Sequence, residues 1–316
     1  MKQPHYHSAL LSHQSAKGFG LVELMIAMVL GLVLIGAATS VMLSNIQSFR
    51  ANKSLVQMQD SARLGFELMA RDIRQAGSIP CGNDINLTTI VSDTPWYLDW
   101  TAGSKGQLIG YPGNSNISGL TGRVDGTEAL SILYVDNIGS SVESTAAATH
   151  TYTLNKVNNG FKSGDIVIVC DAKNGALFKA NIATSSGTDK KMTVTAAQGN
   201  TSSKPGLFEK HSVMGKLKSR AWYIGTNSQG GPSLYLAELN GSALNSIEIA
   251  AGVSKLEFNY RLNDTADFKT ASEVNNRWQQ VNAVKITLEL LNTQSAESGQ
   301  LKRSFSSIVA LRNRIL

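Results

Sequence analysis

The sequence predicts an α+β protein in which one long N-terminal helix packs on an antiparallel β-sheet domain. Two observations support this fold class. A helical pattern extends through the first quarter of the 316-residue chain, and short β-patterned runs separated by Gly-, Ser- and Asn-rich segments occupy most of the rest. A long helix followed only by strands and loops is typical of α+β proteins.

The composition excludes several classes of protein. Hydrophobic residues make up 42% of the chain and charged residues 16%, which argues against both a multi-span membrane protein and a highly charged disordered chain. Two cysteines are too few for a disulfide-dense scaffold or a four-cysteine zinc site. The net charge of +6 is a mild excess for a chain of this length.

The predicted helix begins in an apolar segment. Residues 1–18 form a polar leader with Lys2 and Lys17 and no acid, and residues 19–43 are apolar except for Glu23. About 20 helical residues cross the core of a bilayer, so this segment is long enough to span a membrane once. Positive charge before an apolar segment keeps that end in the cytoplasm, so we expect everything after Leu43 to be exported.

The helical pattern continues beyond the apolar segment, through residues 44–77. No proline occurs there before Pro80, and Gly77 is suited to a helix C-cap. Apolar residues recur at helical spacing among charged ones: Ile46, Phe49, Val56, Phe66, Met69 and Ile73. We therefore predict one helix from about Phe19 to Ala76, lipid-soluble in its first half and amphipathic in its second.

Residues 78–316 are predicted to form the β-rich domain. Strands are expected at Ala129–Asp136, Thr151–Val157, Asp165–Cys170, Leu177–Ala183, Lys191–Thr195, Ala221–Thr226, Ser233–Leu239, Ser246–Ala250, Lys255–Leu262, Val281–Leu291 and Arg303–Arg312.

The segment Lys17-Gly18-Phe19-Gly20-Leu21-Val22-Glu23 resembles the processing site of type IV prepilins and related pseudopilins. This resemblance implies that a prepilin peptidase cuts between Gly18 and Phe19 and that the new N-terminal Phe19 is methylated. It also implies that Glu23 acts in assembly. Physically, an anionic Glu23 in a helical bundle is a partner for the Phe19 amine of a neighbouring subunit, because each charge relieves the desolvation of the other. The alternative is a carboxylate that reaches out to the lipid headgroups.

Later segments resemble the PilW group of type IV pilus minor pilins, over most of the chain outside its loops. The matching residues are Ser61–Leu64, Arg71–Gly77 followed by Cys81, Gly164–Asp171, Ala176–Phe178, Gly231–Tyr235, Asn240-Gly241, Ala251–Val253 with Leu256 and Phe258, and Arg303–Phe305 with Val309–Asn313. The resemblance implies a protein of pilus assembly, initiation and the tip complex, which supports twitching motility, adhesion or DNA uptake.

The same resemblance implies partners and a location. Other minor pilins, the major pilin, the prepilin peptidase and a large tip adhesin are the expected partners. The chain is expected in the inner membrane with its C-terminal domain in the periplasm, and then at the pilus tip on the cell surface. Two alternatives stay open: a J-like pseudopilin of type II secretion, and a secreted β-rich binding or hydrolytic domain whose ordinary signal peptide is cut near Ala38.

Cys81 and Cys170 both lie in the part expected to be exported, where an oxidising compartment favours a disulfide between them. Two separate buried thiols are the alternative. No enzyme is predicted and no cofactor or metal site is expected. Three of the five histidines lie in the leader, and none of the common catalytic or nucleotide-binding motifs occurs.

Two surface features are candidates for binding. Trp96, Tyr97 and Trp100 cluster in a loop-like region, where they would either anchor an interface or cap a local core. A basic stretch runs through Lys204, Lys210, Lys216, Lys218 and Arg220, and a solvated charged face is its ordinary explanation. A nucleic acid is therefore not expected as a direct partner.

Overall fold

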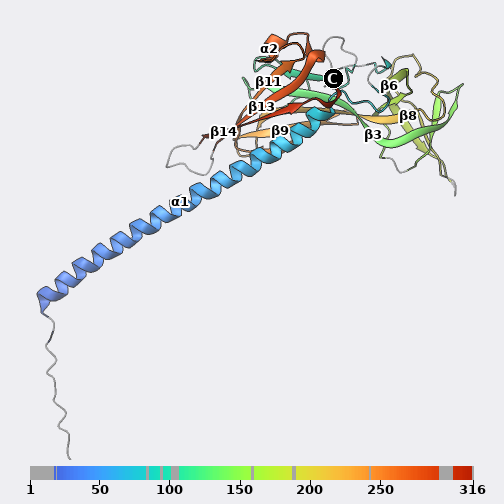
Figure 1. The fold of residues 1–316 in the computed structure, drawn as a ribbon. Coiled ribbons are helices and arrows are strands. Elements are labelled where there is room, and N and C mark those ends of the chain that lie inside the picture. Colours follow the sequence, from blue (N-terminus) through green and yellow to red (C-terminus); the bar gives the residue numbers. More distant parts are fainter. Residues whose placement is uncertain are drawn as a thin grey trace, which may run out of the picture. The chain divides into compact units, whose positions relative to one another are not determined.

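The computed structural model describes residues 18, 20–82, 85–92, 95–100, 107–157, 160–186, 190–241, 243–291 and 302–314, without the side chains of residues 137, 138 and 313. Its first element is the helix α1, Leu21–Gln75, with 55 residues (Figure 1). At about 1.5 Å per residue this helix is roughly 80 Å long. Two residues beyond its last residue, Gly77 has a φ of +73° and so adopts the left-handed conformation that commonly terminates a helix. The predicted long helix and the α+β fold class are confirmed.

The chain divides into two compact units, Met1–Ser54 and Leu55–Leu316. In the first unit, every large apolar side chain of α1 from Leu21 to Leu43 is exposed. Such a surface has no folded partner within this chain among the described residues. A helix that is apolar on all sides is expected to be surrounded by lipid or by other helices.

The second unit contains the remainder of α1 and all the strands. Helix residues Met58, Ala62, Met69, Ile73 and Ala76 are buried at helical spacing and belong to the largest core cluster. A Cβ added at Gly65 would lie 3.0 Å from Leu234 and 3.4 Å from Leu288, so this glycine lets the helix approach two different sheets closely.

One sheet has ten strands. In chain order these are β1 Asn86–Thr89, β2 Leu108–Tyr111, β3 Ala129–Ala146, β4 Thr151–Leu154, β5 Ile166–Cys170, β6 Asn174–Thr184, β7 Met192–Ala196, β8 Val213–Thr226, β9 Pro232–Asn240 and β10 Ala243–Ala251. Their order across the sheet is β10-β9-β8-β5-β6-β7-β4-β3-β2. The strand β1 lies off this path and pairs in parallel with β6.

The two longest strands of this sheet, β3 and β8, each pair with three other strands, and β3 pairs with β2 as well as with the strands described next. The first part of β3 pairs with β8 and its last part with β4, while β8 pairs with β5 near its start and with β9 near its end. Strands β3, β4, β7, β6, β5 and β8 thereby close into a ring. Side chains from these strands, among them Tyr152, Phe178 and Val194, form a separate buried cluster.

The second sheet has four strands, in the order β12-β11-β13-β14. Their bounds are β11 Val253–Leu262, β12 Phe268–Lys269, β13 Val281–Leu291 and β14 Lys302–Ala310, with the short helices α2 Ala271–Val274, η2 Trp278–Gln280 and η3 Arg312–Arg314 around them. Alternate residues of β11 and β13, including Phe258 and Ile286, are buried in the same core as α1. The amphipathic half of α1 is therefore packed against both sheets.

The observed strands differ from the predicted ones in extent and in grouping. All eleven predicted strands are present, and β13 has the predicted bounds. However, β3 extends ten residues beyond Asp136 and β8 begins at Val213 rather than Ala221. The strands form two sheets with one parallel pairing, where a single antiparallel sheet was expected.

Candidate functional site

The helix α1 begins next to an exposed glycine. Gly18 and Gly20 are exposed and lie outside the helix, which begins at Leu21. The carbonyl of Gly20 accepts the first helical hydrogen bonds, from the backbone N–H groups of Glu23 at 3.0 Å and Leu24 at 3.2 Å. Phe19, the other predicted processing residue, lies outside the described residues.

Glu23 lies in the first turn of α1. A carboxylate there interacts favourably with the positive end of the helix dipole and with backbone N–H groups that have no helical acceptor. Its side chain has no hydrogen-bond or ion-pair partner among the described residues. This arrangement leaves the carboxylate available to a partner outside the chain, which is what the predicted pairing with a neighbouring Phe19 amine requires.

The helix that carries Glu23 is long and apolar enough to cross a membrane, and it is the one such helix in the described part of the chain. The small residues Gly36, Ala37 and Ala38 lie in the middle of this helix, which continues without a break to Gln75.

A buried polar network attaches the C-terminal end of α1 to the ten-stranded sheet. The side chain of Asp72 is fully buried. Its Oδ1 accepts a hydrogen bond from Arg220 Nη1 at 2.5 Å, and its Oδ2 accepts one from Trp222 Nε1 at 2.9 Å. Both partners are on β8. Each carboxylate oxygen thus has a donor, as a buried charge requires.

The network continues to the neighbouring strand β9. Glu238 Oε1 lies 3.2 Å from Arg220 Nη2 and 3.0 Å from Lys218 Nζ. Burial raises the pKa of Asp72, and the Arg220 charge and the hydrogen bonds from Arg220 and Trp222 only partly oppose this. Burial acts against the charge of Arg220, but Asp72, Tyr134 and Glu238 together outweigh it, so the pKa of Arg220 is raised.

A disulfide makes a second attachment at the same end of the helix. Cys81, a few residues beyond α1, is bonded to Cys170 at the end of β5, with 6.0 Å between their Cα atoms. Cys170 is fully buried, whereas Cys81 is partly exposed. The hydrogen bond from Gly77 N–H to the Leu133 carbonyl, at 2.8 Å, holds the segment between helix and disulfide against β3.

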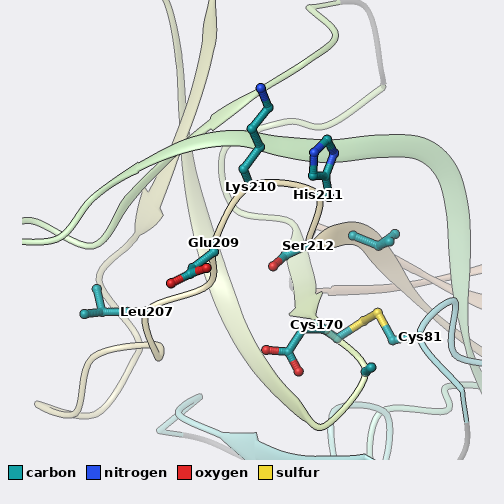
Figure 2. A pocket seen from close by; sticks show the side chains of 10 residues that line it. Cys81, Cys170, Leu207, Glu209, Lys210, His211 and Ser212 are labelled. Carbon is teal, nitrogen blue, oxygen red and sulfur yellow. A yellow bond between two sulfur atoms is a disulfide. The ribbon is translucent and has the colours of Figure 1, made fainter.

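An open cavity of about 610 Å³ borders this disulfide. Opposite the disulfide, the cavity is lined by residues of one loop (Figure 2). They are Leu207, Glu209, Lys210, His211 and Ser212. The side chain of Lys210 points away from the disulfide (Figure 2). No group of three metal-binding side chains occurs among the described residues, here or elsewhere.

The predicted aromatic cluster forms local packing. Trp100 is 6% exposed and belongs to a buried cluster, so it has little surface to offer a partner. Trp96 donates its Nε1–H to the Ser118 carbonyl at 2.8 Å and packs edge-on against Tyr97, with 5.5 Å between ring centroids. Trp96 and Tyr97 are partly exposed, and their role at an interface stays a prediction.

The basic stretch does not form a free cationic face. Lys216 Nζ lies 2.7 Å from the buried Asp165, and Lys218 and Arg220 bind the acids described above. Only Lys204 and Lys210 of the stretch are fully exposed. The three strand residues therefore stabilise the fold, and their charges are balanced within it.

Sequence reasoning did not find the partners of Asp72. One signal was present, because Asp72 lies three residues after Met69 and next to Ile73, on the stripe of the helix that is buried. An acid on a buried stripe indicates a buried cationic or N–H partner. The identity of that partner depends on a contact across 150 residues of chain, which local patterns do not encode.

Comparison with known families gives two matches. Residues 13–39 match the prokaryotic N-terminal methylation motif, and residues 221–308 match the family described as type IV pilus-assembly protein W, PilW. The second match extends from β8 to β14. No curated protein and no solved structure matches the chain.

These matches agree with the geometry at both ends of the chain. The methylation motif covers the exposed glycines, Glu23 and the first part of the apolar helix, which fits membrane anchoring before assembly into a pilus. The PilW match covers strands of both sheets that enclose the amphipathic half of α1. Together the two matches are consistent with a prepilin-like pilin of the PilW family and support a type IV pilus-related protein.

Proposed function

We propose that this protein is a minor pilin that helps to initiate type IV pilus assembly and takes its place in a complex with other minor pilins near the pilus tip. Family membership implies interaction with other pilus components and with the prepilin peptidase. The observation that carries the proposal is an exposed apolar helix with one carboxylate in its first turn, continuous with a helix half that is built into a folded domain.

The proposed mechanism is non-enzymatic and has two steps. The peptidase cuts between Gly18 and Phe19, at a site where both flanking glycines are exposed and non-helical. Glu23 then pairs with the Phe19 amine of an adjacent subunit while the apolar helices bundle. In a low-dielectric environment this ion pair offsets the desolvation of both charges, so it favours one axial register over others.

The proposed organisation follows from this mechanism. Residues 1–18 are the leader, residues 19–43 the membrane and assembly half of the helix, residues 44–77 its amphipathic half, and residues 78–316 the periplasmic domain. Before assembly the protein spans the inner membrane once. The proposed partners are the other minor pilins, the major pilin and a large tip adhesin.

The N-terminal sequence of the mature protein tests the processing step. We expect methylated Phe19 as the first residue. A start near Thr39 would instead identify an ordinary secreted domain and would contradict the proposal. The unbroken helix across Gly36–Ala38 and the match of residues 13–39 to the methylation motif both favour Phe19.

Substitution of Glu23 tests the assembly step. We expect Glu23→Ala to be processed normally but to enter pili poorly, because the amine of the neighbouring subunit loses its partner. Glu23→Asp is the matched variant, since it keeps the charge and should retain part of the incorporation. Normal incorporation of Glu23→Ala would contradict the pairing role.

A J-like pseudopilin of type II secretion would use the same physics in another machine. Deletion of the gene separates the two functions. Loss of surface pili with normal secretion supports the minor pilin, whereas loss of secretion with normal piliation supports the pseudopilin.

A further inference from the structure

Two of the longer strands, β10 and β14, each lie at one end of their sheet and have a neighbouring strand on one side only among the described residues. The strand β10 is the last strand of the ten-stranded sheet and β14 is the last of the four-stranded sheet, and each has nine residues. Within the described ranges, nothing pairs with the outer edge of either strand. An edge of this length presents a row of unpaired backbone N–H and C=O groups, which is a template for a strand of another chain.

The edge of β14 is basic at one end and uncharged along the rest. Lys302 and Arg303 begin the strand, and the residues from Ser304 to Ala310 have no charge, no proline and no glycine. Ile308 is 61% exposed. This segment has no bulge in its pairing with β13, so its outer edge is regular enough to receive a further strand.

The edge of β10 has the opposite charge. Glu248 is its one charged residue, and its neighbour Ile247 is 52% exposed. Residues on both faces of β10 are exposed, from Asn245 to Glu248 without interruption. Leu244 and Ile249 pack partly against buried clusters, whereas the side chains from Asn245 to Glu248 are exposed.

We propose that β14 of one copy of this protein pairs with β10 of a second copy, antiparallel, with Arg303 opposite Glu248. This register places Ile308 opposite Ala243, so the segment Ala243–Glu248 is paired throughout. The pairing of β10 with β9 shifts register only beyond that segment, between Glu248 and Ala250. A parallel arrangement with the same charge pair would leave the second half of β14 without a partner. The antiparallel register therefore joins the opposite charges and satisfies the larger number of backbone groups.

The contact joins two different surfaces and so leaves a free β10 on one copy and a free β14 on the other. Such a head-to-tail interface propagates into rows or closes into rings, depending on the rotation between copies. Both strands belong to the second compact unit, so the interface does not require the apolar helix. It is also independent of whether the protein serves a pilus or a secretion machine.

Cysteine cross-linking of the full chain in detergent micelles tests the register. Asn245 on β10 would lie opposite Ser306 on β14, and the native cysteines are already bonded to each other. A mixture of Asn245→Cys and Ser306→Cys chains should form a mixed disulfide dimer, because directly opposed residues lie within disulfide reach. A mixture of Asn245→Cys with Lys302→Cys, four residues out of register, is the matched control and should not. No cross-link in the first mixture, or equal cross-linking in both, would overturn the proposal.

Charge exchange tests the chemistry of the contact. Arg303→Glu and Glu248→Arg should each weaken self-association by about 2- to 30-fold, because an attractive cross-strand pair becomes repulsive. Analytical ultracentrifugation of the full chain in detergent measures this change. The chain that carries both substitutions restores the attraction and should associate like the original. Association through the helices would not respond to either substitution, and that result would overturn the proposal, as would failure of the double variant to recover.

Discussion

The indole N–H of Trp222 on β8 donates a hydrogen bond to Asp72 on α1, with 2.9 Å between Nε1 and Oδ2. The two residues are 150 positions apart in the chain. Because Asp72 also binds Arg220, one buried carboxylate joins the helix end to two alternate residues of a single strand. The helix that carries the assembly segment is thereby attached to the domain by directional contacts as well as by apolar packing.

Removal of this carboxylate should destabilise the domain strongly. Asp72→Ala leaves the partly buried Arg220 with Glu238 as its remaining partner and leaves the indole N–H without an acceptor, and we expect a loss of roughly 2–4 kcal/mol in the free energy of unfolding. Urea unfolding of the full chain in detergent, followed by tryptophan fluorescence, measures it. Asp60→Ala removes an exposed acid from the same helix and should change stability by less than about 0.5 kcal/mol. Equal effects of the two substitutions would contradict the assigned role.

The network should also leave a signature in the pH dependence of stability. The pKa of Asp72 is raised by burial above its ordinary value of 3.8, so the folded state binds more protons than the unfolded state just above that value. The contribution of Asp72 to the free energy of unfolding therefore falls as the pH rises from its ordinary value through its raised pKa. Asn does not titrate, so the stability of the original protein relative to Asp72→Asn should decrease with pH in this range. An increase would mean that Arg220 lowers the pKa of Asp72 overall.

The disulfide should supply a separate and additive part of the stability. It closes a segment of 89 residues, and the chain-entropy relation assigns about 4–5 kcal/mol to a loop of that size. We expect the variant with Cys81→Ser and Cys170→Ala to lose an amount of this order in urea unfolding. Alanine is chosen at position 170 because the site is fully buried. Dithiothreitol should lower the stability of the original protein to a similar extent and leave the double variant unchanged.

The sequence predicted the helix well because its signals are local. The absence of proline before Pro80, the apolar periodicity and the C-cap at Gly77 all act within a few residues, and α1 ends within one residue of the predicted position. The strand β13 was predicted for the same reason, since its buried residues alternate regularly.

The start of β8 was not predicted, because every second residue in this part of the strand is a cation. These cations are Lys216, Lys218 and Arg220, and the residues between them are small or apolar. A row of cations resembles a solvated segment until their partners are known. Those partners are Asp165, Glu238 and Asp72, which come from three separate parts of the chain. The same limit explains why one sheet was predicted where there are two, since the division depends on long-range pairing.

The four-residue strand β2 was also missed, and one of its residues determines how the two sheets meet. A Cβ added at Gly110 would overlap the hydroxyl and ring of Tyr260, which is on β11 of the other sheet and is fully buried. Gly110 therefore provides the space in which the tyrosine ring lies. The same ring packs edge-on against Trp278, with 4.9 Å between ring centroids.

Gly110→Ala should consequently destabilise the contact between the sheets by about 1–3 kcal/mol, because the overlap forces the buried Tyr260 ring or the backbone to move. Gly231→Ala is the matched control, since its added Cβ would have only ordinary contacts at 3.6 Å and beyond, and we expect little change. Tyr260→Phe removes the nearest atom and should recover part of the loss in the Gly110→Ala background. Thermal unfolding of the original protein, Gly110→Ala, Tyr260→Phe and the double variant gives the coupling energy between positions 110 and 260. A coupling energy of zero would show that the two sheets do not meet at this glycine.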